Sequence, residues 1–244
     1  MHSEKLATAT FAVIDVETTG LDPRVDCVVE IACLRVRMGR IVERFVSFVD
    51  PERDIPARAS KIHGIYASDV AGAPTLRDLH DRLRTMTAGA VVVAHNARFD
   101  VGFLPCIASR PALCTMQMAR RLVDAPSYRN ESLRVFLGLQ TGRPQGVAHR
   151  AEADADVTVA LLLELLRRYE RARGGTTLVE LLTAIARPTR LERFAFGTHR
   201  GTSVARVPTS YLRWIVGADF ESWPDVKHTA RLELGRREAQ ASTE

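Results

Sequence analysis

Two carboxylates, Asp15 and Glu17, lie two residues apart at the end of an apolar run near the start of the chain. The run, residues 11–16, is rich in β-branched side chains and precedes the turn-like residues 18–20, so it predicts a buried strand. Because side chains of a strand alternate between its faces, both acids are expected to point the same way. Two adjacent like charges favour a bound divalent cation, and Mg²⁺ and Mn²⁺ prefer carboxylate oxygens.

A third acid, Asp100, follows a second apolar run at residues 90–94. If this run lies parallel to the first strand, the two carboxyl ends open on one crevice, and Asp100 joins Asp15 and Glu17 there. The alternative is an acid that only stabilises the first turn of a helix beginning near Arg98.

A histidine and a fourth acid stand where a long helical pattern begins, from about Glu152 to Arg171. His149 lies in the preceding loop and Asp154 in the first turns, so both can face the same crevice. Asp156 is a rival ligand, but it points about 200° around the helix from Asp154. A surface histidine and a helix-start acid are the structural alternatives.

Positioning these residues requires a sheet. Residues 28–37 and 41–49 predict a strand hairpin around the turn at residues 38–40, and helical patterns follow at residues 76–86, 115–122 and 132–137. A hairpin followed by alternating helices and strands predicts an α/β sheet of mixed direction.

A boundary is predicted after the long helix. Gly174 and Gly175 break the helical pattern, and Thr177 with Glu180 can cap a new helix. We therefore expect a domain at residues 1–175 and a small C-terminal module at residues 176–244.

Composition limits the classes of protein. The chain has 244 residues, 46% of them hydrophobic, enough for a proper core, and its net charge of +5 favours an anionic partner. Residues 101–150 carry seven arginines against two acids, which fits either phosphate binding or a solvated surface.

The four cysteines have no metal-binding spacing, and no secretion signal or membrane span is evident, so a cytoplasmic protein with reduced thiols is expected.

Three segments resemble, in order, the motifs of the DnaQ-like 3′-to-5′ exonucleases, in the group with four acids and a histidine (DEDDh). They are FAVIDVETTGL at residues 11–21, HNARFDVGFL at residues 95–104 and HRAEADADVTVALLL at residues 149–163. IHGI at residues 62–65 resembles a further segment of this family. The related group with a tyrosine four residues before the last aspartate is excluded, because Arg150 stands there.

The resemblance implies a ribonuclease H-like fold, a mixed five-stranded sheet flanked by helices. It implies that Asp15, Glu17, Asp100 and Asp154 hold two divalent cations, Mg²⁺ or Mn²⁺, about 4 Å apart on the scissile phosphate. His149 would be the general base.

The resemblance also implies four substrate-binding residues. Thr18 would meet the terminal 3′ hydroxyl, His63 would lie near the terminal nucleotide, Asn96 would support the second motif, and Phe99 would stack on the last bases. Packing roles are the alternative for each.

Residues 196–220, FGTHRGTSVARVPTSYLRWIVGADF, resemble the C-terminal module of exodeoxyribonuclease X-like family members, with Thr198 in place of a lysine. Aromatic and basic residues of this segment fit either a surface that grips single strands or a small core. The residues concerned are Phe196, His199, Arg200, Tyr211, Arg213 and Trp214.

The expected function is 3′-to-5′ hydrolysis of DNA, in repair or proofreading-like processing. The expected partners are single-stranded 3′ ends, DNA before RNA, and a polymerase or repair protein, with no membrane. The alternatives are an RNA exonuclease of the ribonuclease T or oligoribonuclease type and a non-catalytic polymerase accessory module.

Overall fold

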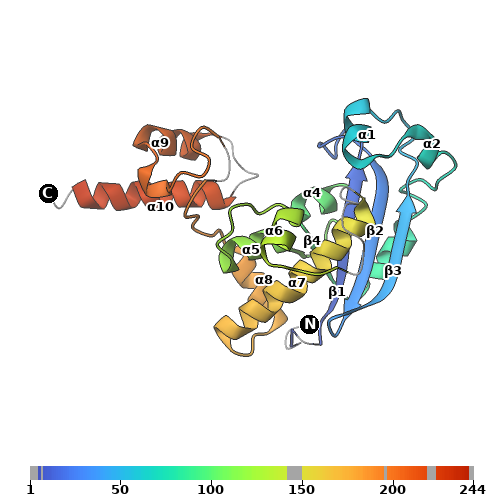
Figure 1. Cartoon of the computed structure of the whole chain (residues 1–244), viewed down its shortest axis with the longest axis horizontal. Coiled ribbons are helices and arrows are strands. Elements are labelled where there is room, and N and C mark those ends of the chain that lie inside the picture. Colours follow the sequence, from blue (N-terminus) through green and yellow to red (C-terminus); the bar gives the residue numbers. More distant parts are fainter. Residues whose placement is uncertain (1–4, 7, 142–149, 195–196, 219–223, 242–244) are drawn as a thin grey trace.

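The computed structural model describes residues 5–6, 8–141, 150–194, 197–218 and 224–241 (Figure 1). Five strands form one sheet in the order β3-β2-β1-β4-β5. Their bounds are β1 Thr10–Thr18, β2 Val28–Arg37, β3 Arg40–Phe48, β4 Val91–Ala94 and β5 Ala112–Cys114.

The sheet is mixed, as the sequence predicted. Strand β1 pairs antiparallel with β2, and β2 pairs antiparallel with β3. Strands β4 and β5 continue the sheet in parallel with β1, with Phe11 opposite Val91. The carboxyl ends of β1 and β4 therefore lie at the same edge, the geometry expected for Asp100 to approach Asp15.

Helices cover both faces of the sheet (Figure 1). Phe11 and Val13 of β1 belong to the core formed with helix α7 (Ala151–Arg173), whereas Ala12 and Ile14 belong to the core formed with helix α3 (His80–Thr87). This alternation puts the next odd-numbered side chains, those of Asp15 and Glu17, on the α7 face.

Except for α10, with 18 residues, the remaining helices are short. Helix α5 has the predicted bounds, whereas α1, α2 and β5 lie in segments for which no element was predicted. Their bounds are α1 Ala57–His63, α2 Ala67–Val70, α4 Ala97–Gly102, α5 Thr115–Leu122, α6 Asn130–Phe136, α8 Leu178–Ala186, α9 Thr209–Gly217 and α10 Pro224–Ala241, with a 3₁₀ turn η1 at Val204–Arg206.

A second core lies in the C-terminal part of the chain. It is built around Phe194, Val204, Leu212, Ile215 and Val226, from η1, α9 and α10. Helix α8 begins with the predicted Thr177–Glu180 capping box, and it packs into the core of the sheet. The division at residue 175 stays a prediction.

Among the described residues, no helix is both long and apolar enough to cross a bilayer. Cys27, Cys33, Cys106 and Cys114 are free thiols.

Candidate active site

Three of the four predicted ligands meet at the carboxyl end of β1. One carboxylate oxygen from each of Asp15, Glu17 and Asp154 lies within 4.8 Å of those of the other two. Residues 139 positions apart are thus brought to one point by packing of α7 over β1. Oxygen donors at this spacing suit a hard divalent cation.

The fourth ligand, Asp100, lies deeper. It is in the first turn of α4, directly after β4, and is only 3% exposed. Its Oδ1 accepts a hydrogen bond from the backbone N–H of Val16 at 3.3 Å, which ties it to β1 between Asp15 and Glu17. Within the described residues its Oδ2 has no hydrogen-bond partner. A buried carboxylate oxygen left unbonded is costly unless a cation joins it.

The acids disturb each other's protonation. Burial raises the pKa of Asp15 well above its ordinary value, and repulsion from Asp100, Asp154, Glu17 and Glu30 raises it further. Burial, followed by repulsion from Asp154, raises the pKa of Glu17 to about 8. Burial also raises the pKa of Asp100 to about 8. Such a cluster is expected to bind either protons or a metal cation at neutral pH.

A bulge and a tight loop end β1 beside the cluster. The pairing with β2 shifts register between Glu17 and Thr18. A Cβ on Gly20 would come within 2.4 Å of the Asp26 carboxylate, which also accepts the backbone N–H of Asp22 at 3.0 Å. A larger side chain at position 20 would displace the Asp26 carboxylate that closes this loop, so Gly20 helps to shape the end of β1.

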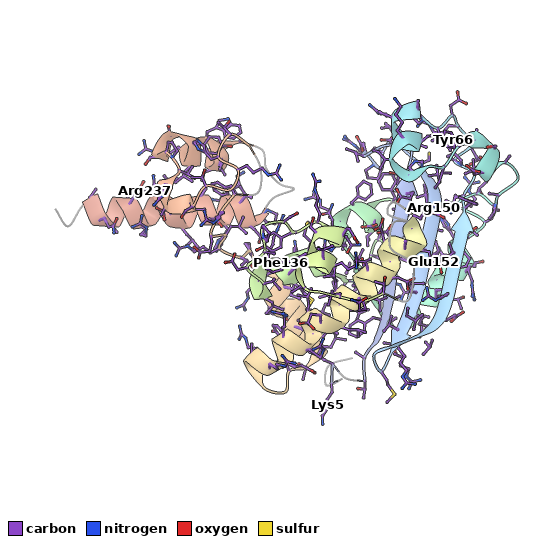
Figure 2. The ribbon with its side chains drawn as sticks, in the orientation of Figure 1. Lys5, Tyr66, Phe136, Arg150, Glu152 and Arg237 are labelled. Carbon is purple, nitrogen blue, oxygen red and sulfur yellow. The ribbon has the colours of Figure 1, made fainter. Side chains whose placement is uncertain are left out.

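The start of α7 is fastened to β2. Arg150 pairs with the buried Glu30 carboxylate at 2.6 Å, and the same carboxylate accepts the backbone N–H of Ala151 at 2.9 Å. Figure 2 shows Arg150 and Glu152 at the end of α7 that lies beside the strands. Glu30 was not among the predicted site residues. An acid inside the apolar run VVEIACL, on a strand paired with the Asp15 strand, was the available signal.

Asp156 has a structural partner. Arg44 of β3 pairs with its carboxylate at 2.8 Å, and with Glu152 at 3.2 Å. Asp15 and Glu17 group with Asp154 and not with Asp156, as predicted. The other predicted residue of this motif, His149, lies outside the described residues.

The predicted substrate residues differ in burial. Thr18 is buried, and its hydroxyl donates to the Gly20 carbonyl at 2.5 Å. His63 is buried, and its Nδ1 accepts the Ile65 N–H at 3.0 Å, a bond that orients the ring. Asn96 is exposed, with a left-handed φ of 68°, a conformation that asparagine tolerates.

Phe99 is half-buried and packs against Phe103, with ring centroids 5.0 Å apart. At the end of β4, His95 forms hydrogen bonds with the Thr115 hydroxyl and the Tyr128 carbonyl, each at 2.9 Å. Burial lowers the pKa of His95 to about 4, so this histidine is neutral and structural at physiological pH.

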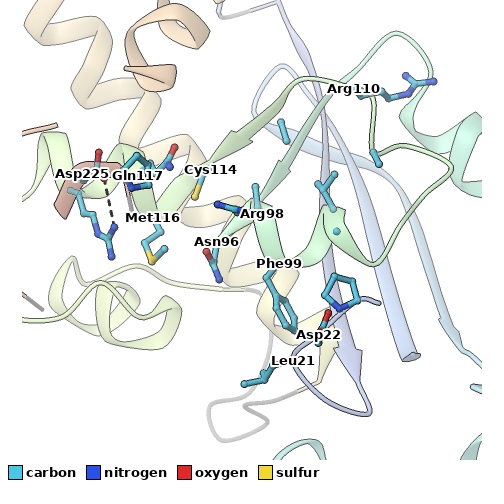
Figure 3. A pocket seen from close by; sticks show the side chains of 18 of the residues that line it. Leu21, Asp22, Asn96, Arg98, Phe99, Arg110, Cys114, Met116, Gln117 and Asp225 are labelled. Carbon is cyan, nitrogen blue, oxygen red and sulfur yellow. Dashed lines mark ion pairs between the residues drawn. The ribbon is translucent and has the colours of Figure 1, made fainter. Parts of the chain in front are cut away.

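A groove of about 1010 Å³ leads away from this region (Figure 3). Leu21 and Phe99 line one part of it, and Asp225 at the start of α10 lines another, as Figure 3 shows. Arg120 of α5, which also lines the groove, pairs with Asp225 at 3.7 Å. The groove thus connects the surroundings of the acid cluster with the C-terminal module.

Most of the arginines predicted as a basic segment bond within the protein. Arg110 donates to the Thr87 carbonyl at 2.7 Å, and Arg134 pairs with Glu131 at 2.6 Å. Arg120 and Arg150 pair with the distant acids Asp225 and Glu30. Structural pairing therefore accounts for much of this positive charge.

The open mixed sheet and the carboxylates at its edge define a class, the metal-dependent nucleases with a ribonuclease H-like fold. The chain belongs to the RNase_T family, described as exonuclease, whose model matches residues 12–162. It is 33% identical to exodeoxyribonuclease 10 of Escherichia coli over 226 residues, covering 91% of this chain and 97% of that protein.

Three further similarities each cover about three quarters of the chain or less. The chain is 32% identical to a PolC-type DNA polymerase III of Thermotoga petrophila over 188 residues, which is 74% of this chain but only 13% of that polymerase. A solved structure of exonuclease X with 5′ overhanging duplex DNA is 34% identical, with a TM-score of 0.61, covering 72% of this chain and 98% of that one. Escherichia coli exonuclease I with a dT13 oligonucleotide shares the fold at 19% identity, with a TM-score of 0.58 over 68% of this chain and 42% of that one.

Proposed function

We propose that the chain is a 3′-to-5′ exonuclease that removes nucleotides from DNA 3′ ends in a metal-dependent hydrolysis, in repair or proofreading-like processing. The observation that carries the proposal is the meeting of Asp15, Glu17 and Asp154 within 4.8 Å, with the unbonded Oδ2 of Asp100 beside them. The donor set is oxygen only, which fits Mg²⁺ or Mn²⁺.

In this proposal the four acids hold two divalent cations. The ions would stabilise charge on the attacking and leaving oxygens of the scissile phosphate. The chain's own residues orient the reaction: the Val16 N–H holds Asp100 in place, and Glu30 and Arg150 hold the start of α7. His149, one residue before Arg150, accepts a proton from the attacking water.

Thr18 and Asn96 are proposed to meet the 3′-terminal nucleotide, and Phe99 to stack on the last bases. Phe99 and Asn96 line the groove, which supports this role. His63, which is buried, is proposed to lie near the same nucleotide.

DNA is the proposed substrate because the chain aligns with nearly the whole of exodeoxyribonuclease 10. The similarity to PolC-type polymerases supports a polymerase or repair partner. A cytoplasmic location is proposed from the four free thiols.

The test is release of labelled nucleotides from matched single-stranded DNA and RNA with a 3′ label, with Mg²⁺ or with a chelator. Release from DNA that requires Mg²⁺ and is lost in Asp15→Asn is expected. Asp124→Asn, a change at an exposed acid, is the matched control. Faster release from RNA than from DNA would show that RNA, not DNA, is the preferred substrate. Metal-dependent binding without any release would reject the proposed exonuclease activity.

A further inference from the structure

The C-terminal module presents an aromatic cluster of three rings, His199, Tyr211 and Trp214. The rings of His199 and Tyr211 meet edge to face with centroids 4.6 Å apart, and those of Tyr211 and Trp214 lie 5.3 Å apart. Trp214 is 53% exposed. Its neighbours Leu212 and Ile215 are fully buried, so α9 already supplies the core without it.

The backbone at Gly197 packs against Tyr211 of the cluster. Gly197 has a φ of +70°, and a Cβ there would lie 2.4 Å from the Tyr211 hydroxyl. The backbone therefore closes directly on Tyr211, which in turn contacts Trp214. A large ring held in place by its neighbours loses little conformational entropy when a ligand stacks on it.

The segment that carries the cluster is positively charged. Residues 197–218 contain three arginines and no acid. Arg200, Arg206 and Arg213 are exposed, and within the described residues none of them forms an ion pair, in contrast to the paired arginines of the first domain and to Arg236 and Arg237. Unpaired arginines beside an exposed indole match the chemistry of single-stranded nucleic acid, which offers phosphates and base faces together.

The groove gives a route to this module. Its lining includes Phe99 near the acid cluster and Val226, which belongs to the core of the C-terminal module. Arg24, Arg98, Arg110 and Arg120 line it against two acids, Asp22 and Asp225. A strand leaving the region of Phe99 can therefore follow a lining with excess positive charge as far as the start of α10.

We propose that the aromatic cluster and its three arginines form a second binding site for single-stranded DNA, which holds the strand upstream of the 3′ end by stacking on Trp214. This inference rests on the proposed exonuclease function for the direction of the strand. In this proposal the part of the chain with the acid cluster cuts the strand, and the C-terminal module retains it.

The test measures binding of fluorescein-labelled single strands of about 5 and about 25 nucleotides to the full chain in chelator, so that nothing is cut. Trp214→Ala is expected to weaken binding of the long strand about tenfold and to leave the short strand unchanged. Leu232→Ala, at an exposed apolar residue of α10, is the control. Equal affinity of wild type and Trp214→Ala for the long strand would overturn the proposal and favour a protein partner for this surface.

Two further variants keep the test decisive if Trp214→Ala unfolds. Arg200→Gln with Arg213→Gln should flatten the salt dependence of long-strand binding by about 0.7 per arginine on a log–log plot. In Trp223→Phe, Trp214 is the remaining tryptophan of the two in the sequence, and the long strand should quench its fluorescence. An unchanged slope and no quenching would reject the site.

Hydrolysis of the short strand in Mg²⁺ distinguishes the two proposals. If short strands are cut equally by wild type and Trp214→Ala while long-strand binding differs, both proposals hold. If nothing is cut but long strands still bind through Trp214, the exonuclease function fails and the second site remains.

Discussion

The guanidinium of Arg150, the residue that precedes α7, donates to the buried carboxylate of Glu30 on β2 at 2.6 and 3.1 Å. Glu30 lies opposite Glu17 in the register of β1 and β2, and it is 2% exposed. It also accepts the Ala151 N–H, so a single acid fixes both the side chain and the backbone where the helix bearing Asp154 begins. The relative position of Asp154 and Glu17 therefore depends on this pair.

Replacing Glu30 by Gln should impair activity more than folding. The amide keeps an acceptor for Ala151 but leaves Arg150 without its counter-ion, and Arg150 is 41% exposed, so the loss of stability should be about 1–2 kcal/mol. We expect kcat to fall about 10- to 100-fold, as for residues that support metal ligands, with a raised Mg²⁺ requirement.

Glu43→Gln is the matched control, because the Glu43–Arg82 pair is exposed on both sides. Arg150→Gln should reproduce the Glu30→Gln defect, and the double variant should be no worse than either single one. Additive losses in kcat, measured by nucleotide release, would show that the two residues act separately.

Divalent cations should stabilise the chain more as the pH rises. The pKa of Glu17 and that of Asp100 are raised to about 8 in the metal-free fold. A raised folded-state pKa means that the folded state binds protons more tightly. The resulting stability is fully present below about pH 4 and is lost as the pH rises through about 8.

Thermal unfolding in chelator and in Mg²⁺, between about pH 5 and pH 8.5, checks this linkage. The midpoint in chelator should fall with pH, and the increase given by Mg²⁺ should grow, because fewer protons compete for the carboxylates. Glu17→Gln should flatten both trends. An increase from Mg²⁺ that is independent of pH would place the cation elsewhere.

Two aspartates of α7 should have separable roles. Asp154→Asn removes a proposed metal ligand, and activity should fall more than about 100-fold, beyond the usual cost of losing a supporting residue. Asp156→Asn breaks the buried end of the pair with Arg44, so it should lower the free energy of unfolding by about 1–3 kcal/mol and keep activity within tenfold. Urea unfolding and nucleotide release on the same preparations distinguish them; the reverse pattern would exchange their assignments.

Local sequence predicted the helices and strands that are long enough to repeat their pattern of apolar residues. The bounds of β2 and α5 match, because each is a sustained run with clear ends. Strand β5 has three residues, too few to show a period, and α1 follows Pro56 inside a proline-flanked segment that resembled a loop. The period of two placed Asp15 and Glu17 correctly on one face.

What local sequence could not supply is pairing between distant residues. Arg120 meets Asp225 and Arg150 meets Glu30, each pair more than 100 positions apart, so the sequence offered only a phosphate-binding or a solvated surface for the arginine-rich segment and not these internal pairs. The exposure of Trp214 was also hidden, since Leu212 and Ile215 on the same helix are core residues and the sequence pattern alone does not separate the three.

His149→Ala tests the general base. A positioned base typically contributes about 10²- to 10⁴-fold, so kcat should fall by that factor while metal-dependent stabilisation remains, because the histidine is not a proposed ligand. The pH dependence of wild-type kcat should include a limb from protonation of this base, and this limb should disappear in the variant. His80→Ala, at a histidine of α3 on the other face of the sheet, is the control. A loss under tenfold, or a pH limb that survives the substitution, would assign proton transfer to another group of the cluster.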